Sequence, residues 1–162
     1  MKRVWALLVL IVFVVSASAA FAEESLLPDV LVNFGNSETF TLHMYDNDPA
    51  VEIYRNITDA GRNLPIYDFD NYDGWEYFQY YDIPSRYDIP AGDQQLIESE
   101  TAGELYYSAP NRVILFYQDA EIPITMTKIG YFENTQEFRD AVAGNEPLEF
   151  WGNLLFIIRY AN

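Results

Sequence analysis

Two isolated residues have side chains that could take part in chemistry, the chain's one histidine, His43, and Arg112. His43 could act as a base or a metal ligand, but no Ser-His-Asp arrangement and no second histidine accompanies it. Arg112 begins an apolar run, where a guanidinium near aromatic rings could polarise a carbonyl or hold a carboxylate. For both, the competing interpretation is a solvent-facing side chain on a strand. We retain only Arg112, as a candidate ligand-binding residue.

A cluster of acidic residues at positions 68–74 suggests calcium. Its candidate metal ligands are Asp68, Asp70 and Asp73. An EF-hand loop needs acidic oxygens at positions 1, 3 and 5, glycine at 6 and glutamate at 12. Here the third aspartate and Gly74 are each one place late, and no glutamate is in register. The alternative is an acidic hairpin turn in which Asp, Asn and Gly serve the backbone. Apart from calcium, the sequence implies no cofactor.

The aromatic segment 75–81 is the most distinctive feature of the chain. Strand alternation would place aromatic side chains on both of its faces. One face carries Trp75, Tyr77, Gln79 and Tyr81, and the other carries Glu76, Phe78 and Tyr80. One face can line the core, whereas the other is either a binding surface or is covered by the connection 82–100. Tyr77 and Tyr81, with Tyr107 from a later strand, are therefore candidate ligand-binding residues.

Alternating apolar residues and turn signals predict the elements that position these side chains. Strands are expected near 30–34, 39–45, 64–69, 75–81, 105–107, 113–117, 124–132 and 154–160. One helix is expected after a cap at residues 46–48, with Ala50, Ile53, Tyr54 and Ile57 on its buried face. A second is expected after a cap at Asn134. The connection 82–100 should hold no more than one helical turn. About eight strands and two short helices indicate a mainly β, closed or nearly closed antiparallel barrel.

Composition limits the partners and the compartment. The 162 residues fit one domain, and a net charge of −16 disfavours nucleic acid and anionic membranes. No cysteine is present, which excludes disulfides and thiol chemistry. Lys2 and Arg3 precede an apolar stretch and the sequence Ala20-Phe21-Ala22, as in a cleaved secretory signal. We therefore predict a signal peptide at 1–22 and one domain at 23–162, in a secreted or periplasmic protein. An uncleaved anchor helix is the alternative.

Three stretches together resemble the bacterial cyclophilin-like family. The first is Thr39-Phe40-Thr41-Leu42 running into Tyr45-Asp46-Asn47-Asp48-Pro49-Ala50. The second is Ala102-Gly103-Glu104-Leu105-Tyr106-Tyr107 followed by Arg112-Val113-Ile114-Leu115-Phe116-Tyr117. The third is Lys128-Ile129-Gly130 followed by Phe138-Arg139-Asp140-Ala141-Val142. The resemblance covers most of residues 38–150 and implies a cyclophilin-like barrel, without supplying an established activity.

The chain departs from true cyclophilins in one respect that bears on function. Prolyl isomerases of that fold carry a Phe-His-Arg type motif near an aromatic pocket, and no such motif occurs here. The sequence therefore favours noncatalytic binding of a peptide, a small molecule or an envelope protein, with Tyr77, Tyr81, Tyr107 and Arg112 as the pocket. The alternatives are a peptidyl-prolyl isomerase or other enzyme of this fold, and a calcium-dependent binding protein. Contact with a membrane is expected only through an uncleaved signal peptide.

Overall fold

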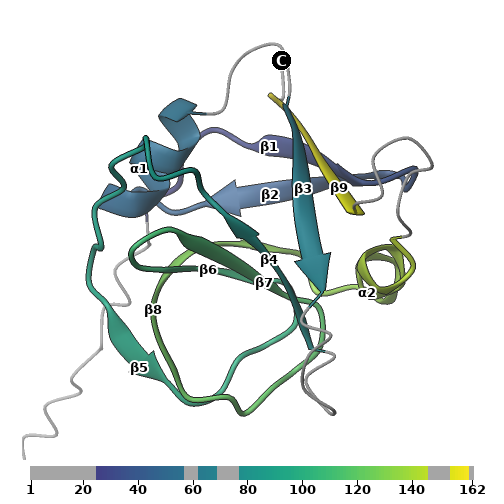
Figure 1. Ribbon diagram of the computed structural model, residues 1–162. Coiled ribbons are helices and arrows are strands. Elements are labelled where there is room, and N and C mark those ends of the chain that lie inside the picture. Colours follow the sequence, from purple (N-terminus) through teal and green to yellow (C-terminus); the bar gives the residue numbers. More distant parts are fainter. Residues whose placement is uncertain (1–24, 57–61, 69–76, 146–153, 161–162) are drawn as a thin grey trace, which may run out of the picture.

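Antiparallel strand pairing dominates the computed structural model of the protein (Figure 1), which describes residues 25–56, 62–68, 77–145 and 154–160. These residues form nine strands and two helices. The strands are β1 (Val30–Phe34), β2 (Thr39–Met44), β3 (Arg62–Asp68), β4 (Phe78–Asp82), β5 (Gln95–Ile97), β6 (Glu104–Ser108), β7 (Arg112–Phe116), β8 (Ile124–Phe132) and β9 (Leu154–Tyr160). The helices are α1 (Asp48–Asn56) and α2 (Gln136–Ala143).

Eight of these strands form a closed ring of pairings. The order is β2-β1-β9-β3-β4-β7-β6-β8, and β8 pairs back onto β2, where Leu42 lies opposite Phe132 and Met44 opposite Gly130. The remaining strand, β5, extends the sheet beside the first part of β8, where Gln95 lies opposite Met126. The predicted mainly β, antiparallel barrel with two helices is therefore confirmed, and the family expectation of a barrel is met.

Side chains alternate between the inside of the barrel and an outer cluster. In β6, Leu105 and Tyr107 pack in the larger, inner core, whereas Tyr106 between them packs in a second cluster. In β7, Leu115 joins the inner core and Phe116 the second cluster. The second cluster also includes Met126 of β8, and Ala120 and Ile122 from the connection between β7 and β8. Because this connection covers the outer face of the sheet, the second cluster is buried as well as the inner core. A sheet buried on both faces explains why β7 is a continuous apolar run in the sequence.

The two helices lie at opposite sides of the barrel in Figure 1, and both pack on its inner core. α1 begins as predicted, because Asn47 Oδ1 accepts a hydrogen bond from the Ala50 N–H at 3.2 Å. α2 is capped by Thr135 and not by Asn134, since the Thr135 hydroxyl accepts from the Phe138 N–H at 3.1 Å. The predicted cap was therefore wrong by one residue.

The connection between β4 and β6 holds a strand that the sequence did not predict. Residues 82–100 contain no helix, which agrees with the expectation of at most one helical turn, but they include the short strand β5. Two of the three β5 side chains are exposed, so the strand leaves no apolar alternation in the sequence. The strand predicted at 75–81 begins only at Phe78, and Trp75 lies outside the described residues. Within the part of the chain that the structure describes, neither helix has the length and apolar character needed to cross a bilayer.

Candidate functional site

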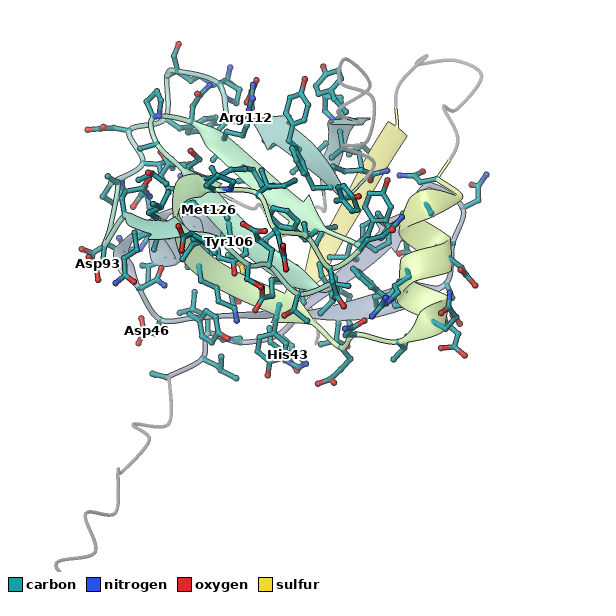
Figure 2. The ribbon with its side chains drawn as sticks, turned by 90° about the horizontal axis from the view of Figure 1, so that it is seen from below. His43, Asp46, Asp93, Tyr106, Arg112 and Met126 are labelled. Carbon is teal, nitrogen blue, oxygen red and sulfur yellow. The ribbon has the colours of Figure 1, made fainter. Side chains whose placement is uncertain are left out.

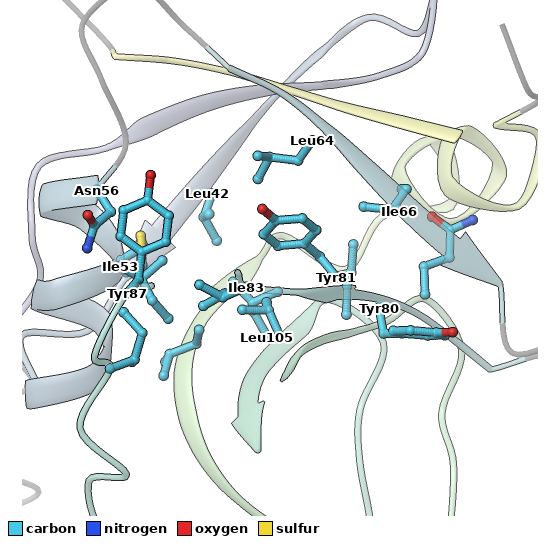
Figure 3. Close-up of a pocket in the computed structure, with 16 residues that line it drawn as sticks. Leu42, Ile53, Asn56, Leu64, Ile66, Tyr80, Tyr81, Ile83, Tyr87 and Leu105 are labelled. Atoms are coloured by element: carbon cyan, nitrogen blue, oxygen red, sulfur yellow. The ribbon is translucent and has the colours of Figure 1, made fainter. Parts of the chain in front are cut away.

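A pocket with an apolar lining opens into the inside of the barrel (Figure 3). Its volume is about 90 Å³. Its lining comes from β2, α1, β3, β4, β6, β7, β8 and the connection after β4. The lining residues are Leu42, Met44, Ile53, Asn56, Leu64, Ile66, Gln79, Tyr80, Tyr81, Ile83, Tyr87, Ile89, Leu105, Val113, Leu115 and Ile129. A concave, mostly apolar cavity with a few polar groups is typical of a small-ligand site.

The connection that follows β4 forms one wall of this pocket. It contributes Ile83, Tyr87 and Ile89, of which the two isoleucines are buried. Backbone hydrogen bonds hold it in place: the Ile83 N–H donates to the Asn111 carbonyl at 2.7 Å, and the Tyr87 N–H donates to the Pro84 carbonyl at 3.0 Å. The wall is therefore tied to the turn between β6 and β7.

Helix α1 contributes the facing part of the lining through Ile53 and Asn56. These residues are three positions apart, so they lie on one face of the helix. The Asn56 amide donates to the Glu52 carbonyl at 2.8 Å, which fixes its orientation. Figure 3 shows Asn56 and Tyr87 together at one side of the pocket, while Tyr81 and Leu64 point toward its centre.

The polar groups of the pocket are few and uncharged. They belong to Asn56, Gln79 and the tyrosines, and the lining includes no Asp, Glu, His, Lys or Arg among the described residues. Gln79 is buried, and its amide donates to the Val142 carbonyl at 3.1 Å, so part of its hydrogen-bonding capacity stabilises α2. Such a lining favours apolar contact and one or two neutral hydrogen bonds, and it offers no acid-base pair.

Of the four predicted ligand-binding residues, Tyr81 lines the pocket and the other three lie elsewhere. Tyr107 is 0% exposed in the inner core, where its hydroxyl donates to the carbonyls of Ile89 (3.3 Å) and Pro110. Burial, with Asp88 nearby, raises the pKa of this phenol. Tyr107 is therefore bonded to the segment that forms the pocket wall and is not itself one of the lining residues.

Tyr77 does not share the face of Tyr81, although alternation predicted that it would. It lies one residue before β4 begins and packs against the second cluster, beside Phe78. Its carbonyl accepts from the Tyr117 N–H at 2.9 Å. The strand alternation on which the prediction rested does not extend to this residue.

Arg112, which is labelled in Figure 2, is not among the residues that line the pocket. Its guanidinium donates to both carboxylate oxygens of Asp82, at 2.7 and 2.8 Å, directly across the β4–β7 pair. Its Cζ also lies 4.3 Å from the centre of the Tyr80 ring. The hydrogen bond with Asp82 raises the pKa of Arg112, so the residue is held as a cation in a cross-strand pair.

The proposed calcium ligands fall largely outside the described residues. Asp70 and Asp73 belong to the segment 69–76, and Asp68 ends β3 with a side chain that is not described. Among the residues that are described, no group of three or more histidine and carboxylate side chains could hold a metal ion. The calcium hypothesis stays a prediction.

Sequence reasoning left open that the connection 82–100 covers one face of the aromatic segment, but it did not identify residues 83–89 as a pocket wall. Three apolar residues, Ile83, Tyr87 and Ile89, lie within a stretch broken by prolines, which gives no helical or strand period. The only indication in the sequence was that three large apolar or aromatic residues occur within seven positions. In contrast, the buried face predicted for α1 did include Ile53, which the structure places in the pocket.

Comparison with known proteins agrees with the architecture just described. A closed antiparallel barrel with an apolar pocket at its core defines a small β-barrel protein. The sequence model of the Cyclophilin-like family matches residues 32–150, and the chain belongs to this family. No curated protein has a matching sequence.

Among solved structures, the chain is similar to one described as "Structure of McbB in complex with tryptophan". The TM-score is 0.56 at 12% identity, and the match covers 82% of this chain and 45% of that one. The chain thus spans less than half the length of the matched structure. At this identity the likeness concerns the fold alone.

Proposed function

We propose that the protein is a noncatalytic binding module that receives a small uncharged apolar group inside its barrel, outside the cytoplasm. The group could be a peptide side chain or part of a small molecule. The observation that carries the proposal is the lining of the pocket, which is apolar with a few neutral polar groups. The secretory signal pattern at the N-terminus supports the compartment.

The size and polarity of the pocket indicate the ligand class. Its volume of about 90 Å³ is smaller than an engineered apolar cavity of about 150 Å³ that takes up benzene. An aliphatic side chain fits this space more readily than an indole ring, unless the segment 83–89 moves outward. A charged group would lose its hydration without gaining an opposite charge, which is strongly unfavourable.

A series of N-acetyl amino acid amides tests this proposal. Valine, leucine, isoleucine, proline, tryptophan, aspartate and lysine amides would each be titrated into isotope-labelled protein, with methyl chemical shifts as the readout. The tryptophan amide is included because the similar structure was solved with tryptophan. We expect saturable shifts at Leu64 and Ile66 with aliphatic amides and none with the two charged amides.

A matched pair of variants locates the binding. Leu64→Phe adds volume inside the pocket, whereas Leu96→Phe makes the same change at a side chain that is 60% exposed on β5. We expect at least a tenfold loss of affinity in the first and less than a twofold change in the second, with circular dichroism confirming that both fold. Equal effects of the two variants, or saturable shifts of the Leu64 and Ile66 methyl groups with the charged amides, would contradict the proposal.

A peptide isomerisation assay tests the competing function, that of a peptidyl-prolyl isomerase. Isomerisation of a proline-containing peptide would be followed with and without the protein. We expect the uncatalysed rate. A rate enhancement that Leu64→Phe abolishes would replace binding by catalysis as the function of the pocket.

A further inference from the structure

A second, open pocket of about 640 Å³ lies where the segment before β6 meets the segment after β7. It is lined by Tyr77, Ser99, Glu100, Thr101, Asp119, Ala120, Glu121 and Ile122. The backbones of Glu100 and Ala120 exchange two hydrogen bonds, at 2.9 and 3.0 Å, which join the two segments. The pocket is separate from the apolar one, because the two share no lining residue.

Glu100 is the unusual member of this lining. Its residue surface is 2% exposed, less than that of Ala120 or Ile122 beside it. One carboxylate oxygen, Oε2, accepts from the Ile122 N–H at 3.2 Å. The other, Oε1, is buried with no hydrogen-bond partner within the described part of the chain. Leaving a buried carboxylate oxygen without a donor is costly, so a donor supplied by a ligand would be bound favourably.

The surroundings of Glu100 select a positive donor. Asp119 and Glu121 add two exposed carboxylates to the pocket, and none of the lining residues is Lys, Arg or His. Arg139 is a charged neighbour of Asp119, with its Nη2 4.0 Å from Asp119 Oδ1, and the Asp119 side chain is 66% exposed. The neighbouring Glu104 is itself neutralised by Lys128, whose Nζ lies 2.7 Å from Glu104 Oε1. Lys128 is therefore engaged by Glu104, and the pocket's own carboxylates have weaker partners: Asp119 Oδ1 has Arg139 at 4.0 Å and accepts from the Ala102 N–H at 2.9 Å.

We propose that this pocket binds an ammonium or guanidinium group, whose N–H donates to Oε1 of Glu100 while Asp119 and Glu121 attract its charge. An inorganic cation fits less well, since the described carboxylates do not come together as a metal-ligand group. An organic cation needs only one close hydrogen bond, and the other charges act over a longer distance. The cation can belong to a free amine or to a basic side chain of a peptide.

Titrations with two cationic probes and one uncharged control test whether the second pocket binds cations. Nα-acetyl-lysine amide, with a free ε-ammonium group, represents a basic side chain of a peptide, and agmatine represents a free amine. Nα-acetyl-norleucine amide is the uncharged control. We expect saturable shifts of the Thr101 and Ile122 amide resonances with the two cations, weakened by added salt, and none with the norleucine derivative. Binding of both cations indicates recognition of the charged group alone, whereas preference for the lysine amide indicates a peptide partner. Equal binding of the norleucine derivative would overturn the inference.

Variants then assign the binding to Glu100. Glu100→Gln keeps an acceptor for the Ile122 N–H and removes the charge, and Glu98→Gln makes the same change at an exposed residue outside the pocket. We expect at least a tenfold loss of cation affinity in the first and less than twofold in the second. Glu121→Gln, at an exposed rim position, should weaken binding severalfold without affecting the fold. If Glu100→Gln and Glu121→Gln both bind the cations as the native protein does, the pocket is not the site.

Binding of both ligand classes to both variants tests whether the two pockets are independent. Leu64→Phe should leave cation binding unchanged, because Leu64 does not line the second pocket. Likewise, Glu100→Gln should leave the binding of aliphatic amides unchanged. A loss of both activities in either variant would indicate a general structural defect and would contradict the assignment of two independent sites.

Discussion

Two glutamates four residues apart show how position decides the ionisation of a side chain. Burial raises the pKa of Glu100, and the Ile122 N–H compensates only in part. Burial alone would also raise the pKa of Glu104, but hydrogen bonds from Lys128, the Thr101 N–H and the Tyr106 hydroxyl outweigh it and lower that pKa. Glu104 is therefore a stabilising carboxylate, whereas the burial of Glu100 disfavours its charged form.

The lowered pKa of Glu104 predicts a pH-dependent contribution to stability. A carboxylate with a lowered folded pKa stabilises the fold above its ordinary value of 4.5, and this contribution is lost as pH falls through the folded pKa. We expect Glu104→Gln to lower the free energy of unfolding by about 1–3 kcal/mol at pH 7, because hydrogen bonds to a charged group are lost. Urea denaturation between pH 7 and pH 3 measures this difference, which should shrink on acidification.

The control for Glu104 is Glu98→Gln, since Glu98 is exposed. Its effect should stay within about 0.5 kcal/mol at every pH. A Glu104→Gln difference that stays constant down to pH 3 would show that the charge of Glu104 does not stabilise the fold.

At the scale of elements, local patterns sufficed wherever a segment has one buried face. β1 and β2 alternate clearly, and the turn at residues 109–111 separates β6 from β7, so their positions were predictable. The cap of α2 was not, because Asn134 and Thr135 are both good cap residues and only the backbone decides between them. β5 was also missed, because its stability comes from backbone pairing with β8 and its side chains are largely exposed.

The α2 cap yields a prediction that distinguishes the two neighbouring residues. Thr135→Ala removes the acceptor of the Phe138 N–H and should cost about 1 kcal/mol of unfolding free energy. Asn134→Ala removes only an exposed hydrogen bond from Arg139 and should cost less than about 0.5 kcal/mol. Chemical denaturation of both variants measures the difference. A larger loss at Asn134 would show that the cap lies one residue earlier, as the sequence pattern alone suggested.

At the scale of the whole molecule, the pocket depends on contacts that no local pattern reveals. β9, from the end of the chain, inserts between β1 and β3, and β8 closes the ring onto β2. These pairings bring α1, β3 and the segment 83–89 together around Tyr81. Of the predicted site residues, Tyr81 lines the apolar pocket, and the sequence could not show which residues surround it there.

The pairing of β2 with β8, which closes the ring of strands, depends on Gly130, a residue without a side chain. A Cβ at Gly130 would lie 2.6 Å from the His43 carbonyl oxygen and 3.2 Å from the Met44 Cα, both backbone atoms that cannot turn aside. Gly130→Ala must therefore push the two strands apart, with an expected loss of about 1–3 kcal/mol of unfolding free energy.

Amide hydrogen exchange shows where this loss arises. In Gly130→Ala, protection should fall mainly along β2 and β8, including the Tyr45 N–H that donates to the Ile129 carbonyl at 3.0 Å. Thr125→Ala, at an exposed position near the start of β8, is the control and should leave protection at β2 unchanged. Because the wall of the apolar pocket includes Leu42 and Met44 of β2, the glycine variant should also bind aliphatic amides more weakly. Native stability and native exchange in Gly130→Ala would mean that the barrel tolerates a wider β2–β8 spacing and that ring closure does not shape the pocket.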